Sequence, residues 1–190
     1  METEIKILMK LIETKEKMTI RELAISIKAD YKIVHTACSR LLKKGIVHIQ
    51  NVGNYRQLSL TNNFSEEIFE AEFRRRQDIL KNKNINLILK EVCKSLSSIN
   101  FILLLFGSYA KKQENNKSDI DLMFIVPFEA MEKEIEKTLA LLPLKIHYLV
   151  FTELQFNKMK DSKEINVVKE AIKNNVVLYG IEQYYALLSE

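Results

Sequence analysis

The sequence predicts an α/β (α+β) chain in which a helical N-terminal part with a hairpin is followed by a part built from strands and helices. Its 190 residues allow one ordinary domain or two small ones. Residues 20–60 carry seven Lys/Arg against two Asp/Glu, whereas residues 61–190 carry 18 against 19, so the basic charge is confined to the first part. The fully apolar run from Phe101 to Phe106 indicates a buried strand in the second part.

Composition excludes several common functional sites. The four glycines are too few and too scattered for a Rossmann fingerprint or a Walker A loop: Gly45, Gly53, Gly107 and Gly180. Cys38 and Cys93 form no paired metal-ligand pattern and no disulfide framework, so we interpret them as reduced core thiols. The longest apolar run has six residues and the N-terminus lacks a signal-peptide pattern, so we expect a cytoplasmic protein without a membrane partner.

The N-terminal part begins with two predicted helices. Residues 2–15 carry apolar side chains at helical spacing, with charged residues between them. Thr19 and Glu22 then form a capping-box pattern, in which the hydroxyl accepts from the amide three residues on and the carboxylate reaches back. This pattern predicts a second, short helix that runs to about Ile27.

A third helix and a hairpin follow. Asp30 can cap a helix over residues 31–44, and Gly45 can end it. Residues 46–50 and 55–60 alternate in polarity around a turn-forming tip at Gly53, which predicts a β-hairpin. The helix is amphipathic, and its apolar side is formed by Val34, Ala37, Cys38, Leu41 and Leu42.

Helices in this order, followed by a hairpin, resemble the winged helix-turn-helix family over about residues 3–60. The resemblance implies that helix 31–44 enters the major groove of DNA. The residues implied to contact DNA are Lys32, Thr36, Ser39, Arg40, Lys43 and Arg56. A basic face that is only solvated, and a protein-binding role, are the alternatives, although the local positive charge favours nucleic acid. We place this domain at residues 1–62.

The domains are joined by a predicted linking helix at residues 63–83, with Phe69, Phe73 and Leu80 on one side. Its basic run, residues 74–76, is interpreted as a solvated face rather than a phosphate contact. We place the second domain at residues 84–190, where an amphipathic helix is expected over 84–98.

Two motifs in the second domain carry chemistry. The strand at 101–106 leads into Gly107-Ser108, where the glycine lets the backbone approach a phosphate and the serine supplies a hydroxyl and an amide. A second strand opens with Asp119-Ile120-Asp121, so the two carboxylates are expected on one face. Neighbouring carboxylates repel unless a cation lies between them, and Mg²⁺ is bound in this way together with substrate phosphates. The combination is typical of phosphoryl or nucleotidyl transfer.

Gly107-Ser108, ten residues, then Asp119-x-Asp121 resembles the signature of minimal nucleotidyltransferases of the polymerase-beta-like superfamily, over about residues 84–180. The resemblance implies a small mixed sheet that binds an NTP, with ATP the expected one, and Mg²⁺, with room for two ions. It implies attack on the α-phosphate with release of pyrophosphate. Gly107, Ser108 and Lys111 are implied to bind the nucleotide, and Asp119 and Asp121 to bind the metal and act in catalysis.

The chain departs from this family's pattern at two positions. Active members place a third carboxylate on a following strand, expected here at residues 144–151, and the matching position holds His147. This histidine is either a general base or a polar edge residue without a role, and it is a poor Mg²⁺ ligand. Glu153 is the alternative carboxylate if the register differs by a few residues. Many members also have a glycine at the position of Lys112.

The remaining elements are expected to support the sheet. Helices are predicted at 129–141, at 152–160 and at 162–173, the last with Ser162 as its cap and Ile165 on its inner side. Residues 176–179 are expected to form a last edge strand, and residues 181–188 a terminal helix.

Two functions of different classes follow. The first is a Mg²⁺-dependent nucleotidyltransferase that modifies a protein or nucleic-acid acceptor and is fused to a DNA-binding winged helix. Relatives of minimal nucleotidyltransferases often act on a protein partner, including toxins of the HEPN class, so the resemblance implies such an acceptor. The second is a DNA-binding regulator or antitoxin whose nucleotidyltransferase domain is catalytically weak or only binds nucleotide or a partner, which the missing third carboxylate favours. The sequence leaves a homodimer open.

Overall fold

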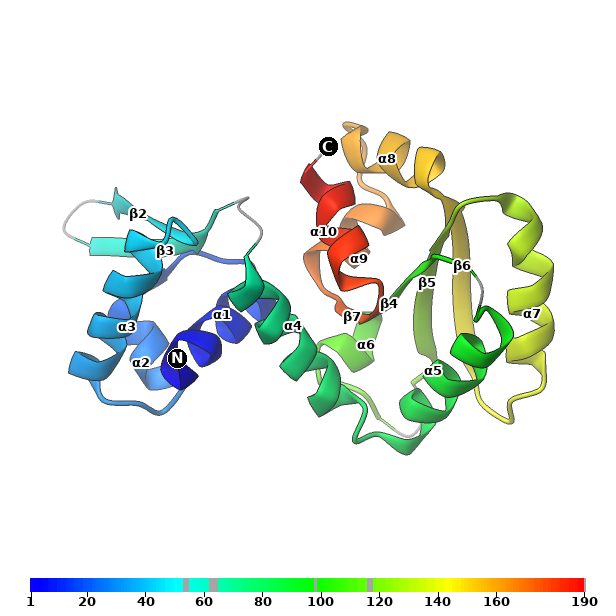
Figure 1. The fold of residues 1–190 in the computed structure, drawn as a ribbon, viewed down its shortest axis with the longest axis horizontal. Helices are drawn as coiled ribbons and strands as arrows, with labels where there is room; N and C mark the ends of the chain where they lie inside the picture. The colour runs from blue at the N-terminus through cyan, green and yellow to red at the C-terminus, as the bar shows by residue number, and fades with distance from the viewer. Residues whose placement is uncertain (53–54, 62–64, 98, 116–117, 190) are drawn as a thin grey trace. The chain divides into compact units, whose positions relative to one another are not determined.

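The chain folds into two compact units, Met1–Arg75 and Arg76–Glu190, in a computed structural model that describes residues 1–52, 55–61, 65–97, 99–115 and 118–189. The first unit combines helices with a small antiparallel sheet, and the second contains a mixed four-stranded sheet (Figure 1). The predicted α/β class is therefore confirmed.

The first unit begins with the helices α1 (Glu2–Thr14), α2 (Ile20–Ser26) and α3 (Tyr31–Lys43). The predicted capping box begins α2, because the Glu22 amide donates to the Thr19 hydroxyl and the Thr19 amide donates to the Glu22 carboxylate at 2.7 Å. Asp30 caps α3, because its carboxylate accepts hydrogen bonds from the backbone amides of Lys32 and Ile33. All three predicted helices are confirmed.

A small antiparallel sheet completes the first unit, with strand order β1-β3-β2. β2 (Val47–Val52) and β3 (Tyr55–Leu60) form the predicted hairpin, whose tip at Gly53 lies outside the described residues. β1 (Met18–Thr19) pairs with β3 and was not predicted. Two residues are too few to carry an alternating pattern, so the sequence gives no signal for this strand.

Two apolar residues are exposed against expectation. Leu42 of α3 is 40% exposed, because it lies at the edge of the apolar side that Val34 and Leu41 bury. On α4 (Glu66–Ile79), Phe73 is 42% exposed, and the buried side consists of Ile68, Ala71, Glu72 and Arg75.

The basic run on α4 is not uniformly solvated, which corrects the interpretation from sequence. Arg75 is buried and donates to the buried Glu72 carboxylate at 2.6 Å, so its charge is compensated inside the first unit. Arg74 pairs with Glu2 and Glu70 at the surface. The carboxylates that pair with Arg74 and Arg75 lie on α4 itself and on α1, and the sequence of the run does not reveal these pairings.

The second unit is built on a sheet with strand order β6-β5-β4-β7. Its strands are β4 (Ile102–Phe106), β5 (Ile120–Val126), β6 (Ile146–Thr152) and β7 (Val176–Tyr179). β4 runs antiparallel to both of its neighbours, whereas β5 and β6 are parallel, so the sheet is mixed. All five residues of β4 are buried, as the apolar run predicts.

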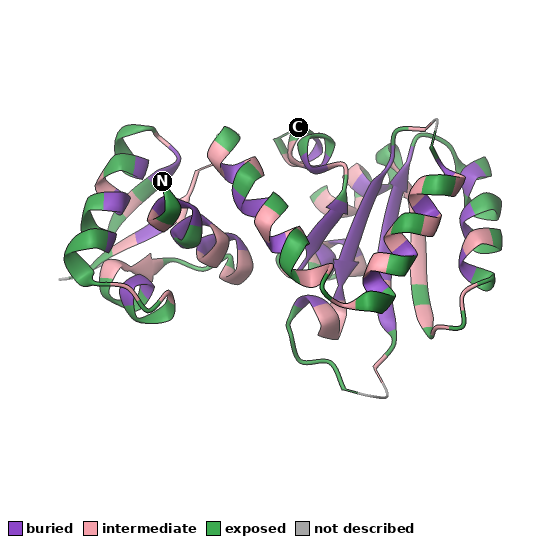
Figure 2. Cartoon of the chain, turned by 60° about the horizontal axis from the view of Figure 1, so that its bottom comes forward, coloured by how far each residue is buried: buried purple, intermediate pink, exposed green. Residues whose placement is uncertain are grey.

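Helices cover both faces of this sheet. α5 (Lys83–Ser95) and α7 (Glu132–Ala140) enclose the main hydrophobic core with side chains such as Leu105, Leu122 and Phe124. The opposite side is covered by α8 (Glu153–Asp161), α9 (Val167–Lys173) and α10 (Ile181–Ser189). Figure 2 shows the buried strands between exposed outer helix faces. The ends of these strands position the polar residues described below.

Helix α9 begins later than its sequence suggests. Asn166, rather than Ser162, caps it by accepting from the Lys169 amide at 3.0 Å. Ser162 instead accepts from the Glu164 amide in the preceding turn, and Ile165 is 99% exposed. The predicted helix at 129–141 is divided into a 3-10 turn (Glu129–Met131) and the helix α7 that follows it.

Both cysteines are free thiols; Cys38 lies in the core, as predicted, whereas Cys93 is only half-buried. Burial raises the pKa of the Cys38 thiol to about 11 and also raises that of Cys93, so neither is a reactive thiolate at neutral pH. None of the helices in the described part of the chain is both long and apolar enough to cross a membrane.

Candidate active site

A glycine and a carboxylate lie in direct contact where β4 ends. β4 leads into the four-residue helix α6 (Gly107–Ala110), and Gly107 adopts a φ of +67°. A Cβ at this position would lie 2.0 Å from Asp121 Oδ2 and 2.9 Å from Asp121 Cγ. The register explains this proximity, because Phe106 of β4 pairs with Asp121 of β5. Glycine is thus required here for both backbone conformation and space.

The two aspartates occupy the start of β5. Asp119 directly precedes the strand and is exposed, and the Asp121 side chain is 26% exposed. Ile120 and Leu122 are buried in the hydrophobic core, so the alternation of the strand holds Asp121 on the opposite face. Both aspartates are therefore accessible to a ligand from solvent.

His147 lies beside Asp121 on the neighbouring strand. The parallel register pairs these two residues, and His147 Nδ1 lies 3.2 Å from Asp121 Oδ1. The same register pairs Val126 with Thr152, so Glu153 lies about 20 Å along the strand direction from His147. Glu153 therefore cannot replace the third carboxylate, and that alternative is wrong.

The other two predicted nucleotide-binding residues lie on and after α6. Ser108 is half-buried, and Lys111 Nζ lies 3.8 Å from Glu170 Oε1 of α9. Glu170 was not singled out from the sequence, because it follows the glycine-serine turn by a long stretch of chain and belongs to no motif. The Glu170 carboxylate would compete with any other anion for the ammonium group of Lys111.

The backbone conformation of Lys112 is one that favours glycine, the residue that the resemblance leads us to expect at this position. It has a φ of +55° and ends α6 in a Schellman motif: its amide donates to Tyr109 O, and the Gln113 amide donates to Ser108 O. A left-handed conformation costs a non-glycine residue about 1–2 kcal/mol.

Replacing Lys112 with glycine is therefore expected to stabilise the second unit by about 0.5–1 kcal/mol, measured as the free energy of unfolding in urea. Lys111→Gly is the matched control, because Lys111 has a right-handed φ of −82° and glycine there should lower stability by a similar amount. Equal effects of the two substitutions would contradict this explanation.

Within residues 1–52, 55–61, 65–97, 99–115 and 118–189, no three His, Cys, Asp or Glu side chains are gathered so that they could hold a metal ion by themselves. The site therefore consists of Gly107 in contact with Asp121, His147 beside Asp121, and the accessible carboxylate of Asp119. Ligands from outside the chain would have to complete the coordination of an ion here.

The residues predicted to bind DNA lie in the first unit. Lys32, Thr36, Lys43 and Arg56 are exposed, and Ser39 is half-buried. Arg40 is 61% exposed, but its guanidinium lies 3.4 Å from the buried carboxylate of Glu4 on α1. Its charge is thus partly neutralised by the first unit itself.

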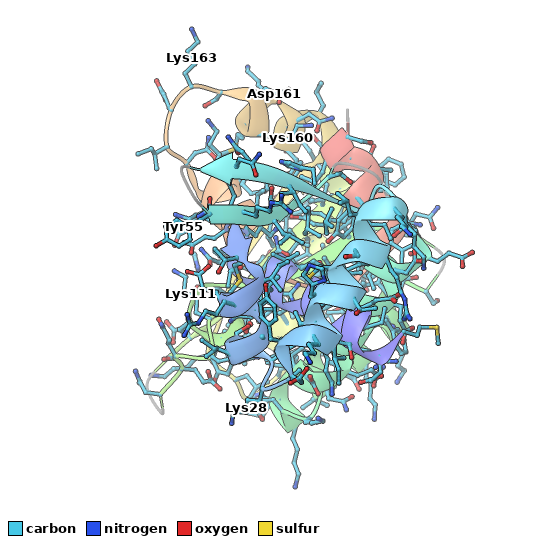
Figure 3. All side chains as sticks on the ribbon, turned by 90° about the vertical axis from the view of Figure 1, so that its left-hand side faces the viewer. Lys28, Tyr55, Lys111, Lys160, Asp161 and Lys163 are labelled. Carbon is cyan, nitrogen blue, oxygen red and sulfur yellow. The ribbon has the colours of Figure 1, made fainter. Side chains whose placement is uncertain are left out.

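A cleft of about 680 Å³ lies between α2, α3 and β3. Arg21, His35 and Arg56 line it together with Tyr31 and Tyr55. Tyr55, which is 69% exposed, and Lys28 in the turn before α3 are labelled in Figure 3. Apart from Arg56, these residues form no pattern in the sequence, because they come from separate elements of the first unit.

Two family models match the chain. One described as "Polymerase beta, Nucleotidyltransferase" matches residues 87–184, which is slightly more than half of the chain, and one described as HVO_A0114 matches residues 3–62. Comparison with curated proteins gave no match, and neither did comparison with solved structures.

Proposed function

The chain belongs to the polymerase beta nucleotidyltransferase family, and on that basis we propose that it is a Mg²⁺-dependent enzyme that transfers a nucleoside monophosphate from an NTP to a protein or nucleic-acid acceptor. One observation carries this proposal: the Gly107 backbone lies against the Asp121 carboxylate, with Asp119 two residues before it. A turn that can approach a phosphate is thereby placed beside carboxylates that can hold the metal of that phosphate.

Asp119 and Asp121 would hold the ion. Their donor atoms are carboxylate oxygens, which Mg²⁺ prefers, and Mg²⁺ is commonly bound by one or two carboxylates together with substrate phosphates. This donor set fits one ion, and the substrate would complete its coordination. When bound, Mg²⁺ supplies Lewis-acid polarisation of a phosphoryl oxygen and neutralises developing negative charge.

The glycine-serine turn and Lys111 would hold the phosphates. Gly107 has no side chain to obstruct the approach, and Ser108 offers its hydroxyl and amide. The ion pair between Lys111 and Glu170 is long and exposed, so it contributes at most about 1 kcal/mol. Lys111 can therefore exchange Glu170 for a triphosphate, which carries more charge.

The direct test incubates the full chain with Mg²⁺ and each α-³²P-labelled NTP. The acceptors are the chain itself, a HEPN-class protein, and nucleic acid. We expect the label on one acceptor and an equal amount of pyrophosphate in solution. Absence of both label and pyrophosphate for every NTP and acceptor would contradict the proposal.

A second function, DNA binding by the first unit, is favoured by the cleft between α2, α3 and β3. We propose that α1–α3 and the hairpin act as a winged helix-turn-helix domain in which α3 enters the major groove. The cleft brings Arg21 and Arg56 together with two tyrosines, and its Glu22 is engaged in the capping box of α2. With this function alone, the chain would be a regulator or antitoxin.

Salt dependence of binding tests this second function. Lys32→Ala combined with Arg56→Ala is expected to reduce the slope of log affinity against log salt by about 2, because each phosphate contact contributes about 0.9 on duplex DNA. The measurement is a mobility-shift titration with the promoter next to the gene at several salt concentrations. Lys133→Ala with Lys137→Ala on α7 is the control with equal charge loss. An unchanged slope for the first pair would contradict the proposed interface.

A further inference from the structure

β6 is an open edge of the sheet in the second unit, and the candidate active site lies beside it. β6 pairs only with β5, and all of its residues are half-buried or exposed, whereas β5 buries every residue except Asp121 (Figure 1). Natural sheets protect such edges with proline, lysine, bulges or very short strands. None of these occurs between Ile146 and Thr152, whose register with β5 is unbroken. β7, at the other edge, has four residues and a register shift in its pairing with β4. The edge that can take up a further strand is therefore β6.

The backbone of β6 offers hydrogen-bonding groups along this edge. The Ile120 amide donates to Lys145 O at 2.9 Å, and the parallel register then directs the backbone groups of every second residue toward β5. The amides and carbonyls of Ile146, Tyr148 and Val150 consequently point away from β5. None of these groups is hydrogen-bonded to another residue in the described part of the chain. An extended peptide can satisfy them by adding to the sheet.

One face of such an added strand would meet negative charge from α7. Burial, followed by the nearby carboxylates of Glu136 and Glu132, raises the pKa of the Tyr148 phenol, which places both carboxylates close to this edge. The opposite flank of α7 faces α5, where Glu134 and Thr138 bond to a serine hydroxyl. The two lysines of α7 lie between these flanks, on its outer side. Basic side chains on the α7 face of an added strand would therefore be favoured.

The other face of an added strand would lie beside the candidate active site. His147 shares this face with Asp121, and the two side chains are hydrogen-bonded, with 3.2 Å between His147 Nδ1 and Asp121 Oδ1. Neighbouring strands are about 4.8 Å apart, so a residue added beside His147 would have its Cα about 10 Å from that of Asp121. Its side chain would point toward a nucleotide held at Asp121 and Gly107.

We propose that the acceptor is a protein segment that adds to β6 as a fifth strand, with basic side chains toward α7 and a hydroxyl side chain toward Asp121. The proposal rests on the proposed function, because it supplies the acceptor of that reaction. The hydroxyl oxygen would bond to the α-phosphorus as the bond from that phosphorus to pyrophosphate breaks, and the hydroxyl proton would pass to water. Nucleic acid is not such an acceptor, because its backbone lacks the repeated amides and carbonyls that pair with a strand.

The probe is a fluorescent peptide of about nine residues, slightly longer than β6, in which lysine alternates with threonine around a central tyrosine. The full chain is titrated into it without metal or nucleotide, and binding is measured by fluorescence anisotropy. We expect saturable binding that weakens at least about tenfold when glutamate replaces the lysines. Methylating one alternate set of peptide amides should abolish binding, and methylating the other set should not. Absent binding, or equal sensitivity to both sets, overturns the proposal.

Variants of the chain locate the peptide. Tyr148→Pro removes an outward amide without removing a bond to β5, and it should weaken binding at least about tenfold. Glu132→Gln with Glu136→Gln should weaken it about three- to tenfold at low salt. Glu164→Gln with Glu182→Gln, outside β6 and α7, is the control with equal charge loss and should change nothing. Unchanged affinity in Tyr148→Pro contradicts addition to β6.

Two further outcomes separate this proposal from its alternatives. Peptide binding with the expected methylation pattern, but without nucleotidyl transfer to any acceptor, would support the edge and contradict the proposed enzyme. Transfer to a protein acceptor at a rate that Tyr148→Pro leaves unchanged would support the enzyme and overturn the role of β6. A dimer that Tyr148→Pro converts into a monomer in sedimentation would show that a second copy occupies this edge, and would overturn it as well.

Discussion

Replacing Gly107 with alanine is expected to reduce nucleotidyl transfer by at least about 100-fold and to destabilise the second unit by about 2–4 kcal/mol. The added Cβ would lie 2.0 Å from Asp121 Oδ2, so either the carboxylate or the turn has to move. The φ of +67° adds the cost of a left-handed alanine, and crowding adds the rest. A displacement of about 1 Å in a reacting group is enough for a loss of this size.

Gly180→Ala separates loss of fold from loss of the site. Gly180 also has a positive φ, +75°, and its Cβ would lie 2.7 Å from the backbone oxygen of Phe101. We expect a comparable fall in the free energy of unfolding but normal transfer per folded molecule. The transfer rates of the two variants are compared at a temperature below the melting temperatures of both. Equal loss of transfer in the two variants would contradict the role of Gly107 at the phosphates.

Asp121→Asn is expected to lower the rate of transfer by at least about 100-fold while leaving stability nearly unchanged. The substitution keeps the shape of the side chain but removes the charge that would hold the metal. The Asp121 side chain is partly exposed and lies against Gly107 and His147, so the free energy of unfolding should change by less than about 1 kcal/mol.

The rate is measured as single-turnover labelling from an α-³²P NTP at saturating metal. Asp161→Asn, on the exposed end of α8, makes the same chemical change away from the site and should leave the rate unchanged. If Asp121→Asn retains more than a tenth of the wild-type rate, Asp121 does not hold the metal that the transfer reaction uses.

The local elements were predictable because their signals are local. Thr19 with Glu22, and Thr152 with Gln155, form capping boxes within four residues, and the structure contains both. The apolar run that forms β4 is equally self-contained. Errors arose where two local choices compete: both Ser162 and Asn166 can cap a helix, and the turn that Ser162 forms with Glu164 decides in favour of Asn166.

Burial was predicted less well than helix formation, because the burial of a helix face depends on the elements that pack against it. Phe73 fits an apolar helix face in the sequence, yet α4 turns its other side inward and buries the pair of Glu72 and Arg75. A sequence pattern gives the period of a helix but not the chemistry of its partner. For this reason, the sequence alone predicts surface charges at Glu72 and Arg75, although the two side chains form a buried ion pair.

The site was predictable along each strand but not across strands. Gly107, Asp119 and Asp121 belong to one continuous motif, and His147 was identified through the family resemblance, as the residue at the position of the third carboxylate. The contact between the Gly107 backbone and Asp121 depends on the antiparallel register of β4 and β5, and the pairing of Lys111 with Glu170 on the packing of α9. Neither contact has a signature in the sequence.

The position of His147 on the edge strand of the sheet has a consequence for the evolution of this sequence. Histidine and aspartate codons differ by a single nucleotide, and the exposed side chain of His147 keeps the exchange outside the hydrophobic core, although an aspartate there would face the Asp121 carboxylate. One point mutation would therefore give this chain the third carboxylate without harming its core. What a third carboxylate costs at position 147 is therefore set by its repulsion from Asp121, which a bound cation would remove, and not by the packing of the sheet.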